Sequence, residues 1–310
     1  MKFKVAVIGA GYFGQKHIKI LTQMPDVEIV GIVDTDISRA QEIGQKYGLR
    51  YYTVYENLLK SADIFFIVTP TITHFDIAMD LIKEKKSIFI EKPLTENPGF
   101  AEKIFDEATK HNIIMQVGLI ERYNPVMKSL LEYVENPLFI HAERLSPFSG
   151  RGIDTDVTYD LMIHDIDLVL MILKKSENLK LTDLKVFTQS IITSKIDYAR
   201  AWLEFVNYND TVEVSLTASR ISSDVRRKFS VIQSANVLYA DLINKTLVKV
   251  DKKGQLTELT VKNKDTHPLY DEIRDFLNSV RQRKYSIHAA SPDDIINTIK
   301  LIEKINGGTH

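Results

Sequence analysis

The stretch from Val5 to Gly14, VAVIGAGYFG, constrains the fold of this chain more than any other. An apolar run leads into three glycines, Gly9, Gly11 and Gly14, and a helix-compatible segment, QKHIKILTQ, follows at once. In a strand, turn and helix of this kind, the first glycine allows a sharp reversal and the second lets backbone N–H groups approach a pyrophosphate. The third lets helix and strand pack closely, and the helix N-terminus adds unpaired donors and a partial positive charge. The stretch therefore predicts a dinucleotide-binding turn.

An acidic residue follows at the distance typical of such a unit. The run VEIVGIVD ends in Asp34, roughly 20 residues past the last glycine, where a carboxylate binds the adenosine ribose hydroxyls. A carboxylate there repels a 2′-phosphate, so Asp34 favours NAD over NADP. Asp34 is also compatible with a cap on the next helix, although Asp36 is the better placed cap. Tyr12 and Phe13, inside the glycine turn, are included with the cofactor-binding residues.

Composition excludes several classes of function. The chain has 310 residues, which is enough for two domains, and its 40 Lys and Arg nearly balance its 41 Asp and Glu. This balance gives no support to nucleic acid or a membrane surface as a partner. The absence of cysteine excludes disulfides, thiol catalysis and thiolate metal sites. Because the N-terminus leads directly into a strand and no apolar run reaches membrane-spanning length, we expect a soluble, cytoplasmic protein.

The order of apolar runs and helical periods changes about 120 residues into the chain. Before that point, strand candidates alternate with amphipathic helices, which predicts an α/β Rossmann domain, a parallel sheet with helices on both faces. These strand candidates are Val27–Val33, Ile64–Val68, Ser87–Ile90 and Ile113–Val117. After it, strand-like runs follow one another without helices between them, which predicts an α+β domain with a largely antiparallel open sheet.

Two loops follow predicted strands where ligands bind in sheets of this type, at the carboxyl ends of the strands. Thr69, Pro70 and His74 follow the run IFFIV, and Glu91 and Lys92 follow SIFI. A proline in each loop stops the strand and fixes the backbone. We assign all five residues to the cofactor side of the site. Lys92 is also compatible with a solvated loop lysine, and His74 with the start of a helix.

One segment of the second half, residues 156–173, is apolar on nearly every side, which indicates a buried helix. Asp156, Asp160 and His164 recur at every fourth residue and Asp167 follows three residues later, so a regular helix would align them in one stripe. Burying ionisable groups costs several kcal/mol unless they are paired or used. One interpretation is a structural hydrogen-bond network or interdomain contact. The other is acid–base chemistry, in which a carboxylate orients a histidine that accepts a substrate proton. A metal site is disfavoured because no further cluster completes a ligand shell.

The motifs VIGAGYFG, TPTITH and EKPL, with Asp34 and the pair Asp160 and His164, resemble in order and spacing the Gfo/Idh/MocA oxidoreductases. The resemblance covers almost the whole chain. It implies that Lys92, Asp160 and His164 form the catalytic group and that NAD is the cofactor.

The resemblance also implies two domains with different functions. Residues 1–120 would form the NAD-binding Rossmann domain, and residues 121–310 a substrate-binding and dimerisation domain. The C-terminal helix, residues 291–306, is a candidate to pack back on the first domain. The open sheet of the second domain would make a homodimer or homotetramer.

Within the family, the segments GLIERYNP, ERLSPFSGRG and DLMIHDIDL look most similar to the UDP-N-acetylglucosamine 3-dehydrogenases. Those enzymes oxidise the 3-hydroxyl of the sugar, and a partner aminotransferase then installs an amine. The chain departs from many relatives in the stretch before the helix of Asp160 and His164, where Gly150 and Gly152 replace a longer glycine-rich run.

The predicted substrate side includes several groups that suit a nucleotide sugar. Guanidinium forks bind a diphosphate bidentately, although they are equally compatible with surface positions or an interdomain salt bridge. The residues assigned to the substrate are Arg122, Asn124, Arg144, Arg151, Asp160 and His164.

In the predicted mechanism, His164 takes the hydroxyl proton while the hydride leaves the same carbon for NAD, and Lys92 stabilises the oxygen. A neighbouring oxidised nicotinamide would disfavour a charged lysine, so Lys92 is the alternative base. Other substrates consistent with the motifs are myo-inositol, a hexose or UDP-N-acetylglucosaminuronate. A non-catalytic NAD-binding regulator is the alternative from another class.

Overall fold

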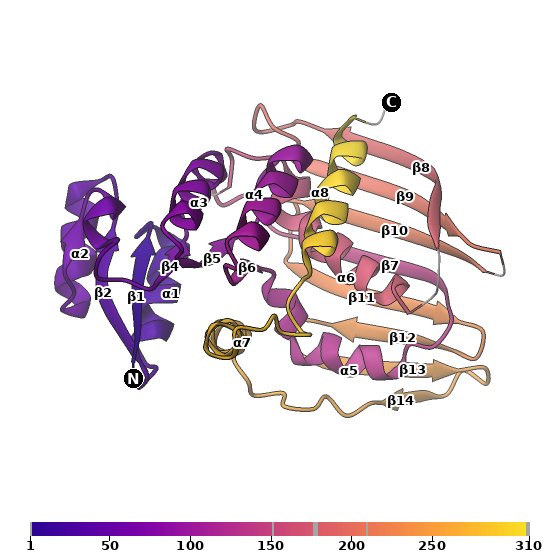
Figure 1. Cartoon of the computed structure of the whole chain (residues 1–310). Coiled ribbons are helices and arrows are strands. Elements are labelled where there is room, and N and C mark those ends of the chain that lie inside the picture. Colours follow the sequence, from indigo (N-terminus) through magenta and orange to yellow (C-terminus); the bar gives the residue numbers. More distant parts are fainter. Residues whose placement is uncertain (1, 151, 176–178, 209, 308–310) are drawn as a thin grey trace. The chain divides into compact units, whose positions relative to one another are not determined.

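The computed structural model describes residues 2–150, 152–175, 179–208 and 210–307. The chain forms two compact units (Figure 1). The first comprises Met1–Ile120 and His267–Ile296, and the second comprises Glu121–Thr266 and Asn297–His310. Residues 267–296, which we had expected in the second domain, therefore belong with the first unit.

In the described part of the first unit, the strands form a six-stranded sheet in the order β3-β2-β1-β4-β5-β6. The strands are β1 (Phe3–Ile8), β2 (Val27–Val33), β3 (Tyr51–Tyr52), β4 (Ile64–Ile67), β5 (Ser87–Glu91) and β6 (Met115–Gly118). Every pair is parallel. Its helices are α1 (Tyr12–Thr22), α2 (Ile37–Tyr47), α3 (His74–Lys83), α4 (Pro98–Lys110), α7 (Pro268–Gln282) and the start of α8 (Pro292–Gly307), with the short turns η1 (Tyr55–Leu58) and η2 (Thr71–Thr73).

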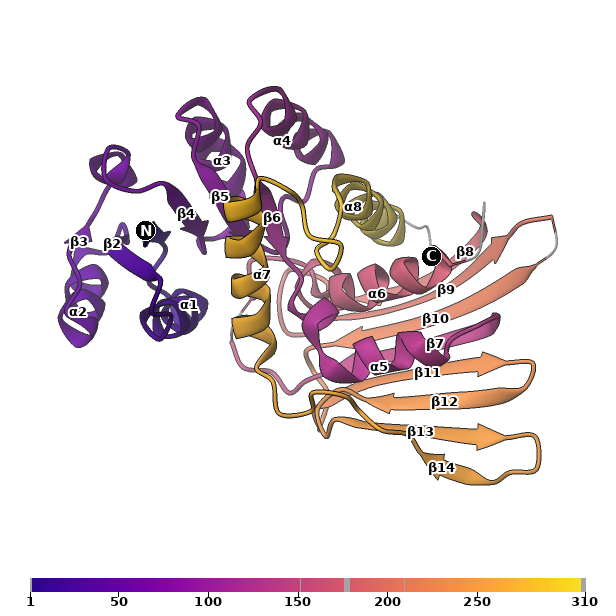
Figure 2. The same cartoon turned by 60° about the horizontal axis from the view of Figure 1, so that its bottom comes forward.

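The strand order reverses between β1 and β4, and this reversal explains the position of the helices. The chain moves outward from β1 to β2 and β3 on one side, and from β4 to β5 and β6 on the other. Because both sets of crossovers are right-handed, their helices lie on opposite faces of the sheet, as Figure 2 shows for α1 and α3. The switch point between β1 and β4 is where ligands bind in such sheets.

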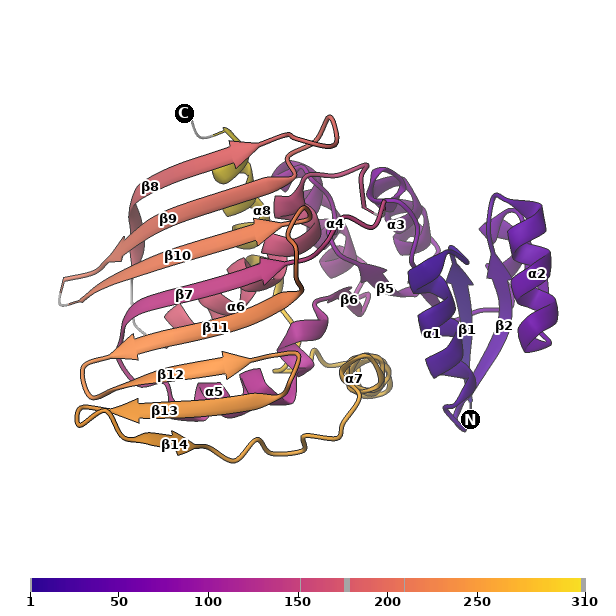
Figure 3. The same cartoon turned by 180° about the vertical axis from the view of Figure 1, so that it is seen from behind.

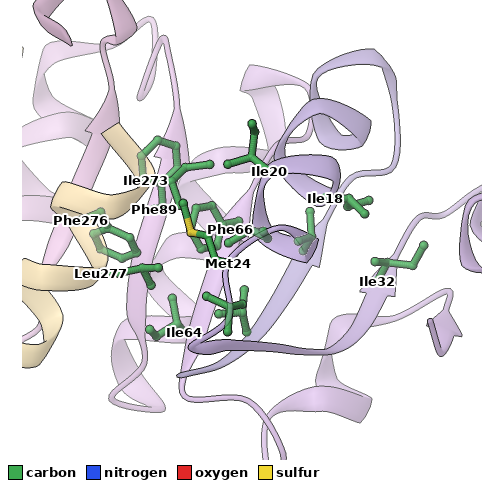
Figure 4. Packing of buried hydrophobic residues seen from close by; sticks show 14 of the residues in the cluster. Ile18, Ile20, Met24, Ile32, Ile64, Phe66, Phe89, Ile273, Phe276 and Leu277 are labelled. Atoms are coloured by element: carbon green, nitrogen blue, oxygen red, sulfur yellow. The ribbon is translucent and has the colours of Figure 1, made fainter. Parts of the chain in front are cut away.

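The first unit is held together by aromatic and aliphatic side chains under α1 and α7 (Figure 4). Phe66 of β4 stacks on Phe89 of β5 at 5.0 Å between ring centroids, and Phe276 of α7 meets Phe66 edge-on at 5.6 Å. All three rings are fully buried. Arg274 of α7 also binds Asp26, just before β2, through two hydrogen bonds of 2.8 and 2.9 Å.

In the described part of the second unit, the strands form an eight-stranded sheet in the order β14-β13-β12-β11-β7-β10-β9-β8. The strands are β7 (Pro137–Leu145), β8 (Lys180–Gln189), β9 (Tyr198–Val206), β10 (Thr211–Ser219), β11 (Arg226–Gln233), β12 (Asn236–Asp241), β13 (Thr246–Asp251) and β14 (Leu256–Glu258). Pairing is antiparallel except between β7 and β10, where Ile140 lies beside Val214 in a parallel register. The predicted fold class, a Rossmann unit and a largely antiparallel open sheet, is confirmed.

Helices α5 (Pro125–Tyr133) and α6 (Ile163–Leu173) lie on one face of the eight-stranded sheet (Figure 2). The opposite face of the sheet turns toward the viewer in Figure 3, and neither α5 nor α6 covers it. The alternating burial of β9 follows from this arrangement, since residues such as Ala201 and Leu203 face the helices and are fully buried. A short π-helical turn, η4 (Thr158–Met162), leads into α6, and η3 (Ile120–Tyr123) precedes α5.

None of the helices in the described ranges combines the length and apolar character that crossing a membrane requires.

Candidate active site

The glycine turn after β1 has the geometry that the sequence predicted. Gly9 has a φ of +97°, and a Cβ on it would collide with the carbonyl oxygen of Val68, while a Cβ on Gly14 would collide with the carbonyl oxygen of Gly9. A Cβ on Gly11 would instead point into open space, with no atom within 4 Å. Two glycines therefore serve tight packing, and the third leaves the side facing solvent uncovered.

The N-terminus of α1 is suited to a phosphate group. Its N-cap, Gly11, provides no side-chain cap, and the first turn has no acidic residue. Tyr12 and Phe13 are about half exposed, at 53% and 50%, and Lys16 lies 4.4 Å from the ring centroid of Tyr12. The start of α1 thus has neither a side-chain cap nor an acidic residue in its first turn, which fits the pyrophosphate of a dinucleotide.

Asp34 connects the end of β2 to the glycine turn. One carboxylate oxygen accepts a hydrogen bond from the backbone of Ala10 at 2.9 Å, and the other accepts one from the backbone of Asp36 at 3.0 Å. Asp36, not Asp34, caps α2, because its side chain accepts hydrogen bonds from the backbone of Ser38 and Arg39. The sequence analysis missed Arg39, whose guanidinium lies 3.3 Å from the Asp34 carboxylate.

His74 joins the two loops that follow β4 and β5. Its ring nitrogens lie 2.9 Å from the carbonyl oxygen of Thr69 and 3.0 Å from that of Pro93, and the side chain is almost fully buried. Burial lowers the pKa of His74 below its ordinary value despite these carbonyl contacts. His74 is also the first residue of α3. Because its ring contacts a carbonyl group of each loop, it fixes the backbones of both loops, beside Thr69 and Lys92. Cofactor binding by Thr69, Pro70 and His74 stays a prediction.

Glu91 and Lys92 lie at the carboxyl end of β5. The Glu91 carboxylate accepts a hydrogen bond from the backbone N–H of Lys92 at 3.2 Å. Its other oxygen is 2.7 Å from Nε2 of His17, a residue of α1 that the sequence analysis left without a role. Burial would raise the pKa of Glu91, but His17 and Lys92 together lower it below its ordinary value.

The aspartates and histidine of the segment 156–173 do not form the single stripe that the sequence predicted. The segment begins with the π-helical turn η4 and becomes an α-helix only at Ile163, so the four-residue period is broken. Asp156 lies before the turn and accepts hydrogen bonds from the backbone of Ile196 and the side chain of Asn306. Asp167 pairs with Arg122. These two acids are therefore structural.

Asp160 and His164 have different surroundings from the two structural acids. Asp160 lies in the π-helical turn and is half-buried, and His164, in the first turn of α6, is 9% exposed. The backbone of Gly152, with a φ of +63°, approaches so closely that a Cβ there would lie 2.8 Å from the Asp160 carboxylate. Arg220 holds this loop by donating hydrogen bonds to the carbonyl oxygens of Gly152 and Thr155.

Arg122 and Arg144, which we had assigned to the substrate, are buried within the second unit and bind carboxylates there. Arg122 donates two hydrogen bonds to Asp167, at 2.8 and 2.6 Å. Arg144 donates to Asp165 at 2.7 Å and to Glu121 at 2.8 Å. Of the two interpretations of these arginines, the structure favours ion pairing, and it places the pairs inside one unit rather than between domains.

The charges around Arg144 are coupled. Burial raises the pKa of Asp165 above its ordinary value despite the neighbouring guanidinium. Glu121 also loses solvation, but Arg144 and the nearby Arg227 hold its pKa below the ordinary value. The two carboxylates keep the pKa of Arg144 raised although its burial opposes this.

Asn124 and Arg151 were also assigned to the substrate. Asn124 is buried and caps α5, and its amide donates to Glu121 and to the carbonyl oxygen of Leu242. Its hydrogen bonds therefore stabilise the second unit. Arg151 lies outside the described residues. Among the described residues, no group of three or more His, Cys, Asp or Glu could hold a metal ion.

Comparisons with known proteins find similar oxidoreductases by sequence and by structure. Residues 3–119 match the model of the oxidoreductase family GFO_IDH_MocA with its NAD-binding Rossmann fold. UDP-N-acetylglucosamine 3-dehydrogenase of Acidithiobacillus ferrooxidans is 29% identical over 286 residues, covering 89% of this chain and 88% of the relative. A solved structure of that enzyme superposes on this chain with a TM-score of 0.88 at 26% sequence identity, covering 100% of this chain and 98% of the other.

A second relative catalyses a related reaction. Myo-inositol 2-dehydrogenase of Thermotoga maritima is 24% identical over 264 residues, covering 81% of this chain and 79% of the relative. The glycine turn, the open N-terminus of α1 and Asp34 fit the dinucleotide that the family binds. Residues 3–119 therefore match the NAD-binding Rossmann domain of the Gfo/Idh/MocA oxidoreductases, and the chain as a whole is similar to dehydrogenases that act on the CH–OH groups of sugars and related polyols.

Proposed function

We propose that this protein oxidises the 3-hydroxyl of UDP-N-acetylglucosamine to the 3-keto sugar with NAD. The observation that supports this substrate most directly is the similarity to UDP-N-acetylglucosamine 3-dehydrogenase along 89% of the chain. The order of motifs supports it as well, because Lys92, Asp160 and His164 are all present.

The residues of the first unit would bind the cofactor, which accepts a hydride when bound. The backbone donors at the start of α1 would bind its pyrophosphate, and Asp34 its ribose hydroxyls. Asp34 favours NAD because a second negative charge beside its carboxylate would be repelled. Glu91 and His74 would hold Lys92 and its loop at the carboxyl end of β5.

The residues of the second unit would remove the proton. In this proposal His164 takes the proton of the 3-hydroxyl as the hydride leaves the same carbon, and Asp160 orients the imidazole. The ammonium group of Lys92 stabilises the negative charge that develops on the oxygen. A neutral Lys92 acting as the base is the alternative division of roles.

The diphosphate of the substrate needs contacts other than the buried arginines. Arg122, Arg144 and Asn124 are used in ion pairs and a helix cap, so contacts with the diphosphate would have to come from other groups of the second unit. Arg227 is half exposed and lies 3.5 Å from Glu121, at the edge of the buried charge network. It is the described arginine of this network that is best placed to reach an anionic substrate.

A panel of substrates tests the reaction. The purified full chain is mixed with NAD and, separately, with UDP-N-acetylglucosamine, UDP-N-acetylglucosaminuronate, glucose and myo-inositol, and NADH absorbance is followed. We expect the highest kcat/KM with UDP-N-acetylglucosamine. A higher value with myo-inositol would support the second candidate, which the similarity to myo-inositol 2-dehydrogenase favours. NAD binding without turnover of any substrate would indicate a regulator and overturn the proposal.

Two proposals about partners go with this function. The open face of the eight-stranded sheet would form a homodimer or homotetramer, which the molar mass in solution would show. A 3-keto sugar is a substrate for transamination, so a partner aminotransferase would consume the product.

A further inference from the structure

His17 is a polar residue in a position suited to an apolar one. It lies on the inner face of α1 and is fully buried. Its ring packs beside the stacked rings of Phe66 and Phe89, at 5.8 and 5.3 Å between ring centroids. These are the central aromatic side chains of the first unit, and leucine or phenylalanine would fill the same space without desolvating a polar group.

The burial of His17 is only partly compensated. Because the carboxylate of Glu91 is an acceptor, Nε2 of His17 must donate the 2.7 Å hydrogen bond between them. Nδ1 is buried and has no hydrogen-bond partner. An unsatisfied buried polar atom costs about 1–3 kcal/mol. A residue that lowers stability in a core is expected to have a second role.

The hydrogen bonds of Glu91 show what that role is. One carboxylate oxygen binds His17, and the other accepts the backbone N–H of Lys92. Both oxygens pack against Gly118 of β6, where a Cβ would lie 3.1 Å from each. The Glu91 side chain is thus held on three sides by α1, β6 and the residue that follows it. A chain of two hydrogen bonds leads from His17 to the backbone of Lys92.

We propose that His17 is a positioning residue that, through Glu91, fixes the backbone of Lys92 relative to the helix of the glycine turn. This inference rests on the proposed catalytic function of Lys92. It gives α1 two functions: its N-terminus binds the cofactor, and its second turn aligns the lysine that acts on the substrate. The two groups must keep a fixed separation, because a displacement of about 1 Å can reduce a rate about 100-fold.

Substitutions of His17 separate positioning from packing. His17→Phe fills the aromatic site and removes the donor, whereas His17→Gln keeps an N–H donor near the position of Nε2. We expect His17→Phe to lower kcat about 100-fold. We expect His17→Gln to recover kcat to within about tenfold of the parent, since it restores one hydrogen bond. The dissociation constant for NAD, measured by titration calorimetry, should change little in both variants, because the pyrophosphate and ribose groups are bound elsewhere.

Glu91→Gln provides a second route to the same conclusion if His17→Phe folds poorly. It keeps the shape of the side chain and removes its charge, and it should lower kcat as His17→Phe does. The double variant should be no slower than the slower single variant, because both changes break one chain of contacts. Glu107→Gln, at a partly exposed carboxylate of α4 paired with Lys110, is the matched control and should leave kcat unchanged.

Three results would overturn the inference: a parent-like kcat in His17→Phe, a loss of NAD binding in proportion to kcat, or additive losses in the double variant. The Lys92→Ala variant distinguishes a failure of this inference from a failure of the proposed function. Full turnover by Lys92→Ala would overturn the role of the lysine itself. An inactive Lys92→Ala beside a fully active His17→Phe would overturn only the positioning role.

Discussion

Gly152 lies against the carboxylate of Asp160, the residue to which we assign a role in catalysis. Its φ of +63° is compatible with glycine and strained for other residues, and a Cβ would lie 2.8 Å from the Asp160 carboxylate. Gly150 has a similar φ of +69° but has no atom within 4 Å of its Cβ position. The two glycines therefore share a left-handed backbone conformation and differ in the contact with Asp160.

We expect Gly152→Ala to lower kcat at least tenfold more than Gly150→Ala does, because only the former would displace the Asp160 carboxylate, which we propose orients His164. Both variants should lose a similar amount of stability, about 1–2 kcal/mol, from the left-handed backbone. Steady-state kinetics and thermal unfolding of the two proteins measure these effects. Equal kcat values in the two variants would show that the position of Asp160 is not important for turnover.

Asp34 and Arg39 form a pair that bears on the choice of cofactor. The Asp34 carboxylate disfavours a 2′-phosphate, whereas the guanidinium 3.3 Å away would bind one. Asp34→Ser should therefore raise the ratio of kcat/KM for NADP to that for NAD by about 100-fold, equivalent to about 2.7 kcal/mol. Asp36→Asn, which keeps the cap of α2, is the control. An unchanged ratio in Asp34→Ser would show that another residue selects the cofactor.

At the residue scale, the sequence predicted groups whose chemistry follows from a local motif. The glycine turn and Asp36 as a helix cap both follow from neighbours in the chain, and the structure confirms them. It did not predict which charges pair, because Arg144 and Asp165 are brought together by packing across 21 residues. The same is true of His17 and Glu91, which are 74 residues apart.

At the element scale, the π-helical turn before α6 is the main departure from the predicted pattern. The sequence of the segment is consistent with an uninterrupted helix, since its apolar residues have no break. The turn arises where Asp156 and Val157 are bound to the backbone of Ile196, which fixes the entry to the helix. The hydrogen bonds of Asp156 are long-range, so no local pattern reveals them. The π turn displaces Asp160 from the regular helical stripe. Single π-helical turns within helices are common at functional sites.

The attachment of α7 to the first unit has a predictable dependence on pH. Hydrogen bonds from Arg274, and a further one from Arg281, lower the pKa of Asp26 to about 2 against partial burial, from an ordinary value of 3.8. A lowered pKa stabilises the fold above pH 3.8, and this contribution is lost as the pH falls toward 2. We expect Asp26→Asn to lower the free energy of unfolding by about 1 kcal/mol at pH 7, allowing for solvent screening.

Unfolding of Asp26→Asn and the parent by urea, at several pH values, measures this contribution. The difference between them should shrink as the pH falls below 4. Asp63→Asn, at an exposed position of the same unit, should leave the stability unchanged. A difference that stays constant down to pH 2 would show that the charge of Asp26 does not hold α7.

Because Arg144 belongs to a buried charge network, its substitution should lower stability. Substitution of a substrate-binding arginine would instead raise KM. Arg144→Leu leaves Asp165 and Glu121 without their main cation, so it should lower the free energy of unfolding by about 3–5 kcal/mol. Arg227→Leu, at the half-exposed edge, should change stability little and raise KM for the nucleotide sugar. A stable Arg144→Leu variant with a raised KM would instead restore the substrate-binding role that the sequence suggested.

At the scale of the whole molecule, the sequence predicted the class of each sheet but not all of its strands. The strands β1, β2, β4, β5 and β6 lie in mainly apolar stretches of the sequence, which identify them. The edge strands β3 and β14 contain two and three residues, too few to show a period. The parallel pairing of β7 with β10 joins strands 66 or more residues apart, and strand order of that kind is set by tertiary packing.

The proposed reaction is hydride transfer from one carbon of the sugar to NAD with the help of Lys92 and His164. The most direct test uses UDP-N-acetylglucosamine with deuterium on the carbon of the 3-hydroxyl, a single turnover with bound NAD, and mass spectrometry of the reduced cofactor. We predict that the deuterium appears in NADH with the parent protein and that transfer is strongly slowed in both Lys92→Ala and His164→Ala. Unlabelled NADH from the parent, or labelled NADH at parental rates from both variants, would contradict this account.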